Sequence, residues 1–353
     1  MSLTLYVDRA RFRANQQRVL ERRPGLVPVA KGNGYGVSVE TLAAEAAALG
    51  VDVLAVGTYD ELPAAESAFP GSLLVLTPWR PFGAADRASS DPRVIHTVSR
   101  PDDLARLLDT EPGARFVLEH VTSMLRHGMT ATQLRELAEA RSGSGDDGRL
   151  EGLEGVAFHL PMTGGSHLAE VRRLLTDVVA AGLPTRTVFV SHLTDDELAA
   201  LARDWPDFTI RPRTGTDLWL GDREALRARA TVLDVHPVDR GAVYGYRGRS
   251  APRAGTILVV SGGTAHGIGL EAPTGAGTVR ARAAALARGG LDAVGLVRSP
   301  YSIGGKPRLF AEPPHMQASM LFLPAGAPVP EIGDEVDVRV RFTATSFDRV
   351  QFS

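Results

Sequence analysis

The chain contains only two lysines, Lys31 and Lys306, and every other member of its 39 lysine and arginine residues is arginine. Arginine replaces lysine wherever only surface charge matters, but a guanidinium does not deprotonate and cannot attack a carbonyl as a neutral amine. Lys306 lies in the loop-like sequence GGKPR, where a lysine kept by chance is the simpler interpretation. Lys31 is the better candidate for chemistry.

Lys31 ends an apolar run and begins the sequence K-G-N-G-Y-G. A desolvated amine at that position has a lowered pKa, which prepares it as a nucleophile or as the partner of a carbonyl compound. The three alternating glycines allow a tight turn, and Tyr35 offers a hydroxyl group near any bound anion. The alternative interpretation is a glycine-rich turn that happens to contain a lysine.

The elements that must position Lys31 follow a repeating pattern. Eight short apolar runs alternate with segments of helical periodicity, and the runs span residues 25–31, 51–58, 72–78, 93–99, 114–120, 153–161, 186–192 and 207–213. Eight strand–helix units are the number that closes a (β/α)8 barrel of the TIM type. An open doubly wound sheet is the alternative; it usually has fewer strands and often a G-x-G-x-x-G after the first, which is absent here.

The pattern changes at about residue 225. Short β-type runs separated by glycine and proline then dominate, at 231–238, 241–249, 255–263, 291–299, 316–324 and 335–342, and one helical stretch spans 278–288. We therefore predict a barrel over residues 8–224 and a mostly β C-terminal domain over 225–353, with residues 1–7 pairing with the latter. Residues 142–149, SGSGDDGR, are expected to form a surface loop.

Composition limits the function classes. A length of 353 residues suggests about two domains. The net charge of -2 gives no overall field for nucleic acid or a membrane surface, and the absence of cysteine excludes disulfides, thiolate metal sites and cysteine nucleophiles. No apolar run approaches the ~20 residues of a membrane span, and the N-terminus lacks the apolar segment of a signal peptide. We expect a cytoplasmic protein without nucleic-acid or membrane partners.

Polar residues gather at the ends of the predicted strands. Those at the run ends are Lys31, Glu119, His120, His159, Ser191, His192, Arg211 and Arg213. In barrel enzymes the active site lies at the C-terminal ends of the strands. Each residue alone has a bland explanation, since loops begin there, but the set around one lysine predicts a site.

The motif K-G-N-G-Y-G at residues 31–36 resembles the K-A-N-A-Y-G motif of the alanine racemase family, the fold-type III enzymes that use pyridoxal 5'-phosphate (PLP). The resemblance implies that Lys31 holds this cofactor and that Tyr35 lies beside it. The segment 118–128 is similar to the family's T-G-M-x-R-x-G segment, which implies that Arg126 contacts the cofactor's phenolic oxygen and the substrate carboxylate.

Three further segments complete the implied cofactor site. The segment 152–160 resembles the strand whose histidine lies beside the pyridine ring, here His159. The segment 210–221 resembles R-x-G-I-x-x-Y-G, which places Arg213 on the pyridine nitrogen and the backbone of Gly215 and Thr216 on the phosphate. A looser match makes Ser191 and Thr194 phosphate candidates. An arginine keeps the ring nitrogen unprotonated, which weakens the ring as an electron sink and favours proton removal and return.

The sequence also departs from the family. The family's catalytic tyrosine, supplied by the partner subunit in G-Y-A-D-G, corresponds to Thr264 in S-G-G-T-A-H-G, and His266 stands at the aspartate. Met316 matches a substrate-side methionine, whereas the neighbouring aspartate is absent. Glu119 aligns with a lysine that the family often carbamylates, so we expect it to pair with Arg126. His266 is the nearest titratable alternative to the missing tyrosine, since its ordinary pKa is near ~6.5.

Three functional hypotheses remain open. The first is a PLP-dependent amino-acid racemase that acts as a homodimer with shared active sites. Lys31 would act on one face of Cα and an unidentified group within residues 262–267 or 314–317 on the other. Alanine is a doubtful substrate because Thr264 is too weak an acid. The second is another PLP-dependent reaction; related decarboxylases and dehydratases use cysteine, which is missing. The third is a non-catalytic PLP-binding protein, although such carriers resemble the barrel alone. We expect no metal site.

Overall fold

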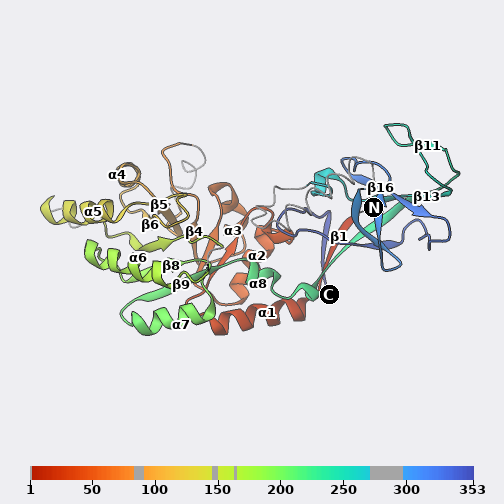
Figure 1. The fold of residues 1–353 in the computed structure, drawn as a ribbon. Helices are drawn as coiled ribbons and strands as arrows, with labels where there is room; N and C mark the ends of the chain where they lie inside the picture. The colour runs from red at the N-terminus through yellow and green to blue at the C-terminus, as the bar shows by residue number, and fades with distance from the viewer. Residues whose placement is uncertain (1, 83–90, 145–149, 163–164, 271–296) are drawn as a thin grey trace. The chain divides into compact units, whose positions relative to one another are not determined.

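Eight parallel strands close into a barrel in the computed structural model, which describes residues 2–82, 91–144, 150–162, 165–270 and 297–353 (Figure 1). Each strand pairs with the next along the chain, and the first pairs with the last. The strands are β2 (Val27–Ala30), β3 (Val53–Val56), β4 (Ser72–Val75), β5 (Val94–Val98), β6 (Arg115–His120), β7 (Leu153–Phe158), β8 (Thr187–Val190) and β9 (Thr209–Thr214). The prediction of a (β/α)8 barrel is confirmed.

Helices surround the strands in Figure 1. They are α1 (Arg9–Arg22), α2 (Val39–Ala48), α3 (Leu62–Glu66), α4 (Pro101–Thr110), α5 (Ala131–Ser144), α6 (Leu168–Ala181), α7 (Asp195–Asp204) and α8 (Thr216–Leu220), with 3-10 turns at Gly34–Gly36 (η1), Tyr59–Glu61 (η2) and Arg223–Ala225 (η5). None of the described helices is long and apolar enough to cross a bilayer.

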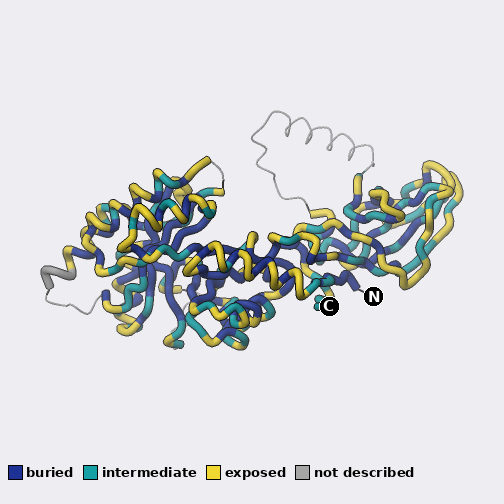
Figure 2. Tube along the Cα trace, turned by 90° about the horizontal axis from the view of Figure 1, so that it is seen from below, coloured by how far each residue is buried: buried dark blue, intermediate teal, exposed yellow. Residues whose placement is uncertain are grey.

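The barrel interior is filled by apolar side chains. Figure 2 colours much of the barrel's backbone as buried. Its packed cluster consists of Val27, Val29, Val53, Ala55, Leu74, Ile95, Val117, Ala157 and Phe189. Residues that alternate with these, such as Leu54 and Val56, are also fully buried. Burial on both faces explains why the barrel strands are continuous apolar runs in the sequence instead of an alternation with polar residues.

The rest of the described chain is mostly β, as predicted. Its elements are β1 (Leu3–Val7), β10 (Leu226–Val238), β11 (Val243–Tyr244), β12 (Arg249–Ser250), β13 (Gly255–Ser261), η6 (Thr264–His266), β14 (Arg298–Ile303), β15 (Lys306–Phe310), β16 (Ala318–Pro324), β17 (Glu335–Val338) and β18 (Arg349–Phe352). An additional pairing of β10 with β13 closes six of these strands into an antiparallel ring. The N-terminal strand β1 pairs with β10 and, in parallel, with β18.

The chain divides into two compact units. Residues 13–221 form the barrel unit, and residues 1–12 with 222–353 form the β unit. The helix expected at 278–288 and most of the run at 291–299 lie outside the described residues. The surface loop expected at 142–149 is wrong for its first three residues, because helix α5 continues to Ser144; helix ends are the least determined part of a periodic pattern.

Gly152 offers a test of how tightly strands β6 and β7 meet. Its carbonyl accepts a hydrogen bond from Phe116 N at 2.8 Å, and a Cβ at this position would overlap the backbone carbonyl of Ala114. We expect Gly152→Ala to lower the free energy of unfolding by about 1–3 kcal/mol, because backbone cannot yield as a flexible side chain does. The measurement is the urea midpoint.

Gly113→Ala is the matched control, since a Cβ there has no other atom within 4 Å. Its free energy of unfolding, obtained from the urea curve, should stay within about 0.5 kcal/mol of that of the parent protein. Equal midpoints for the two variants would contradict the close approach at Gly152.

Candidate active site at the C-terminal end of the barrel

Lys31 directly follows strand β2, at the end of the barrel where the strands' carboxyl termini meet. The turn after it uses left-handed backbone at Gly34 and at Tyr35, where φ is +60° and +55°. The carboxylate of Glu61 accepts the N–H of Gly32 at 2.8 Å and of Gly57 at 2.6 Å, which ties the turns after β2 and β3 together. A Cβ on Gly57 would lie 2.9 Å from the Lys31 Cβ, so the turn leaves room for no larger residue.

The surroundings of Lys31 favour its neutral amine. Burial lowers the pKa of Lys31, and the positive charges of Arg126 and Arg213 lower it further, whereas Glu61 acts in the opposite direction. A lysine with a lowered pKa has a larger fraction of neutral, nucleophilic amine at neutral pH. The structure thus brings together the three cations that the sequence placed at one site.

Arg213 is a buried cation on strand β9. Its Nη2 donates to the carbonyl of Phe158 at 2.9 Å, while its buried Nε has no hydrogen-bond partner among the described residues. Burial lowers the pKa of Arg213 to about 10, and the charge of Glu119 partly opposes this shift. The side chain remains cationic at neutral pH and holds an unused donor in a water-poor place.

Glu119 lies near the end of β6 and is 3% exposed. Burial raises the pKa of its carboxyl, and Arg213 and Arg126 act against that shift. The expected pairing of Glu119 with Arg126 is wrong as a contact, because neither a hydrogen bond nor an ion pair joins them in the described chain. The Oε2 atom of Glu119 is buried without a partner.

Arg126 is exposed because it lies on a loop that folds back over β6. The N–H of Met129 donates to the Glu119 carbonyl at 2.7 Å, and Val121 N donates back to Met129 at 2.9 Å. Gly128 makes this return possible: its φ is +126°, and a Cβ would overlap the Val121 backbone. The loop brings Arg126 close enough to lower the pKa of Lys31 without a direct bond.

His159 follows strand β7, and Ser191 follows β8 beside it. The Ser191 hydroxyl lies 3.2 Å from His159 Nδ1 and accepts the N–H of Leu160 at 3.2 Å. Burial, with the charges of Arg213 and Arg126, lowers the pKa of His159 to about 3. His159 is therefore a neutral ring at neutral pH.

Tyr35 and Gly215 meet at the same barrel end, where they follow the neighbouring strands β2 and β9. A Cβ on Gly215 would overlap the Tyr35 hydroxyl, so only glycine allows this approach. Burial raises the pKa of Tyr35 to about 12, which keeps the hydroxyl a donor. Helix α8 begins here with Thr216, and its first backbone N–H groups have no intrahelical partner. The arrangement offers a hydroxyl and free amides to an anion.

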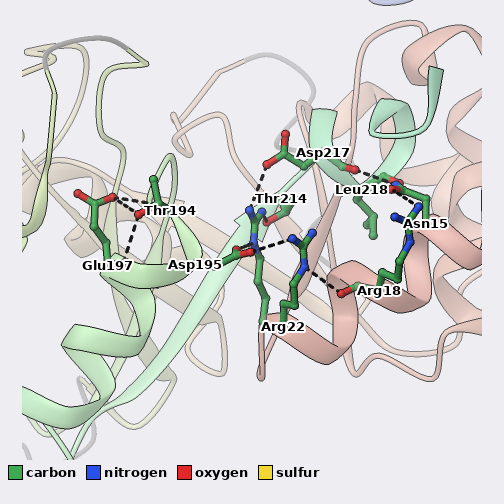
Figure 3. A network of polar contacts seen from close by, with 10 residues as sticks. Asn15, Arg18, Arg22, Thr194, Asp195, Glu197, Thr214, Asp217 and Leu218 are labelled. Atoms are coloured by element: carbon green, nitrogen blue, oxygen red, sulfur yellow. Dashed lines mark hydrogen bonds and ion pairs between the residues drawn. The ribbon is translucent and has the colours of Figure 1, made fainter.

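Figure 3 shows the polar network that fixes this edge of the barrel. Arg23 donates to Asp195 at 2.6 Å, Thr214 at 3.1 Å and Asp217 at 3.1 Å, and so joins α1 to the starts of α7 and α8. Asn15 donates to the carbonyls of Asp217 and Leu218 at 2.9 Å each.

Thr194 belongs to the same edge and begins helix α7. Its hydroxyl accepts the Glu197 N–H at 3.2 Å and donates to the Glu197 carboxylate at 3.0 Å (Figure 3). Both functions of this hydroxyl are thus used in capping the helix.

The β unit contains the remaining predicted site residues. Both ring nitrogens of His266 are engaged there: Nδ1 accepts the Gly263 N–H at 3.2 Å, and Nε2 lies 3.1 Å from Asp348. Met316 is 72% exposed. The turn at Thr264 hydrogen-bonds to the segment that contains Met316, through Thr264 N to the His315 carbonyl at 2.8 Å.

Sequence reasoning missed Glu61 and left His192 without a role. The spacing Thr58-x-x-Glu61 is a helix-capping signature that could have indicated a carboxylate turned toward its own N-terminus. His192 has left-handed backbone, with φ of +59°, and its ring centroid lies 5.5 Å from that of His159. Nothing in the sequence signals that conformation. Within the described residues no group of three or more His, Asp or Glu could hold a metal ion.

A closed parallel barrel with a lysine after its first strand, followed by a β unit, defines the class of this fold. Residues 7–194 match the family described as alanine racemase, N-terminal domain, which is more than half of the chain. The chain therefore belongs to the alanine racemase family. No curated protein matches the sequence.

Solved structures show the same fold along the whole chain. The chain is similar to alanine racemase from Bartonella henselae with covalently bound pyridoxal phosphate (16% identity, TM-score 0.72, 100% of both chains covered). It is also similar to alanine racemase of Clostridium difficile 630, with 16% identity and a TM-score of 0.72. The match covers 100% of this chain and 96% of that one. Alanine racemase from Streptomyces coelicolor A3(2) is 20% identical, with a TM-score of 0.68. The match covers 96% of this chain and 89% of that one.

The lowered pKa of Lys31 can be measured directly because the chain has only one other lysine. Competitive acetylation over a pH series, read by mass spectrometry, should place the Lys31 midpoint below the ~10.4 of an ordinary lysine. Arg126→Gln should raise it, since removal of a neighbouring positive charge favours the protonated amine. The exposed Lys306 serves as the internal reference.

Arg106→Gln, on helix α4, is the control substitution for a general change in charge. A Lys31 midpoint that is the same in the parent protein and in Arg126→Gln would show that Arg126 does not act on the amine.

Proposed function

We propose that this protein binds PLP at the C-terminal end of its barrel and acts at the Cα of an amino acid, with racemisation as its reaction. The observation that carries the proposal is Lys31: a partly buried amine after the first barrel strand, flanked by the charges of Arg126 and Arg213. The family membership supports the same cofactor. A covalently bound pyridoxal phosphate is named for the similar Bartonella henselae enzyme.

The residues present fit this cofactor. The buried Nε of Arg213 is an unused donor, and a ring nitrogen is an acceptor that would use it. The hydroxyl of Tyr35, which lies directly against Gly215, and the backbone N–H groups of Gly215 and Thr216 at the start of α8 suit a phosphate. The neutral ring of His159, oriented by Ser191, suits the face of an aromatic ring. Thr194 contributes by fixing the start of α7.

Bound PLP supplies an electrophilic carbonyl and a ring that delocalises the electron pair released at Cα. The chain's own residues do the rest. Lys31 would hold the cofactor through its amine and would take up or return a proton on one face of Cα. Arg126 is placed to attract the substrate carboxylate. Arg213, which is cationic at neutral pH and has an unused Nε donor, would donate to the ring nitrogen and so would favour rapid return of the proton.

Alanine itself remains a doubtful substrate in this proposal. Thr264 stands where the family has its tyrosine, and a hydroxyl of that kind is too weak an acid to serve near neutral pH. We further propose a homodimer in which one subunit's β unit completes the other subunit's barrel site. A residue other than Thr264 must then act on the second face of Cα.

Borohydride reduction of the PLP-loaded protein, followed by peptide mapping, tests the cofactor assignment. We expect a visible absorption band that reduction removes and a label on Lys31, because the amine's lowered pKa favours attack on the carbonyl. The variant Lys31→Arg keeps the charge and should lose both. A label on Lys306, or no band after incubation with PLP, would contradict the proposal.

Arg213→Glu tests the ring-nitrogen contact. A carboxyl group in place of the guanidinium would favour a protonated ring nitrogen, lengthen the lifetime of the carbanion and increase side reactions. We expect a shifted visible spectrum and release of keto acid from amino acids, with Arg213→Lys as the control that keeps a cation. An unaltered spectrum and product profile in Arg213→Glu would show that Arg213 is not at the nitrogen.

A further inference from the structure

One histidine of the β unit is held in a way that differs from His266. His315 Nε2 lies 2.6 Å from the Glu312 carboxylate, and Glu312 is 2% exposed. The other ring nitrogen, Nδ1, has no partner in the part of the chain that the structure describes. His266, by contrast, has contacts on both nitrogens, to Gly263 and Asp348.

The buried carboxylate of Glu312 is enclosed by the neighbouring hairpin. Gly245 packs against it so closely that a Cβ there would overlap the carboxylate oxygens. The Tyr246 ring centroid lies 4.6 Å from that of His315. A carboxylate fixed in this way accepts Nε2–H, which leaves the lone pair of Nδ1 free to accept a proton.

His315 also faces an open space. A hollow of about 630 Å³ is lined by Tyr246, Arg247, Thr264, Glu312, His315 and Met316, among others. Thr264 and Met316 are the residues that the family resemblance places on the substrate side. The backbone joins these segments, through Thr264 N to the His315 carbonyl and Ala265 N to the Met316 carbonyl at 2.9 Å. His315 therefore lines the same hollow as Thr264, which stands at the position of the missing tyrosine.

We propose that His315, oriented by Glu312, is the acid/base group that the β unit supplies to the amino-acid site of a second copy, and that His266 is a structural residue. The inference rests on the proposed function. In the step, the bond between Cα and hydrogen breaks as the Nδ1–H bond forms, and the electron pair stays with the substrate until a proton returns. The reverse transfer delivers the proton to the face opposite Lys31, so no oxidant or reductant is needed.

A footprinting experiment tests the position of His315 without measuring activity. The PLP-loaded protein is treated with diethyl pyrocarbonate, with and without aminooxyacetate, a carboxylate that traps carbonyl cofactors. Labels are read by peptide mapping. We expect aminooxyacetate to slow modification of His315 by about tenfold or more and to leave His236, whose side chain is 57% exposed, unchanged. His315 labelled at one rate in both samples would overturn the proposal.

Deuterium exchange tests the role. A panel of L- and D-amino acids is incubated with the loaded protein in D₂O, and Cα deuterium and chirality are followed. His315→Gln should slow deuterium exchange at Cα of one enantiomer by on the order of 10²–10⁴-fold. Exchange of the other enantiomer, whose proton Lys31 removes, should continue. Glu312→Gln should give a smaller loss on the same enantiomer, which marks Glu312 as a positioning residue.

His266→Gln is the control and should change exchange by less than about tenfold. If His266→Gln loses exchange from one enantiomer and His315→Gln exchanges both as the parent protein does, the assignment is overturned in favour of His266. The visible band and the borohydride label on Lys31 are measured on every variant. A missing band in the parent protein means that the proposed function has failed, and the inference fails with it; a normal band with unchanged exchange in His315→Gln refutes the inference alone.

Discussion

A buried arginine is costly to hold, because moving a charge from water into a protein interior costs about several kcal/mol even after relaxation. Arg213 is such a residue: Nη2 donates to the Phe158 carbonyl, while Nε has no partner among the residues that the structure describes. The charge of Glu119 partly offsets that of Arg213. A cation kept in that state is suited to bind an acceptor. The lowered pKa of Lys31 and the neutral state of His159 both follow in part from its field.

The scaffold around this charge is correspondingly tight. Backbone turns close to one another at Gly57, Gly128 and Gly215, where any side chain would meet Lys31, the Val121 backbone or Tyr35. Interiors packed this closely transmit small displacements, so substitutions at such glycines move the reactive groups as well as the backbone. The barrel thus positions its polar residues through backbone approach as much as through hydrogen bonds.

The sequence by itself determined the fold class and singled out Lys31 as the candidate for chemistry. Eight continuous apolar runs predicted the barrel, because a parallel strand that is buried on both faces is apolar along its whole length and shows no alternation with polar residues. Lys31 in K-G-N-G-Y-G indicates the candidate site because arginine, the chain's common basic residue, cannot act as a neutral amine. Strand ends at His159, Ser191 and Arg213 could be placed together, since parallel strands bring their carboxyl ends to one edge.

Only the tertiary structure decided which polar groups meet. The family resemblance predicts that Glu119 pairs with Arg126. In the structure the loop that returns at Gly128 leaves Arg126 exposed, and the charge of Arg213 acts on the buried carboxyl of Glu119. Likewise, His266 is the titratable residue nearest in sequence to Thr264, the position of the family's tyrosine. In the described structure both ring nitrogens of His266 have partners, whereas only Nε2 of His315 does. Hydrogen-bond partners far apart in the chain carry no local signal, so residue type and spacing identify the candidates and packing selects among them.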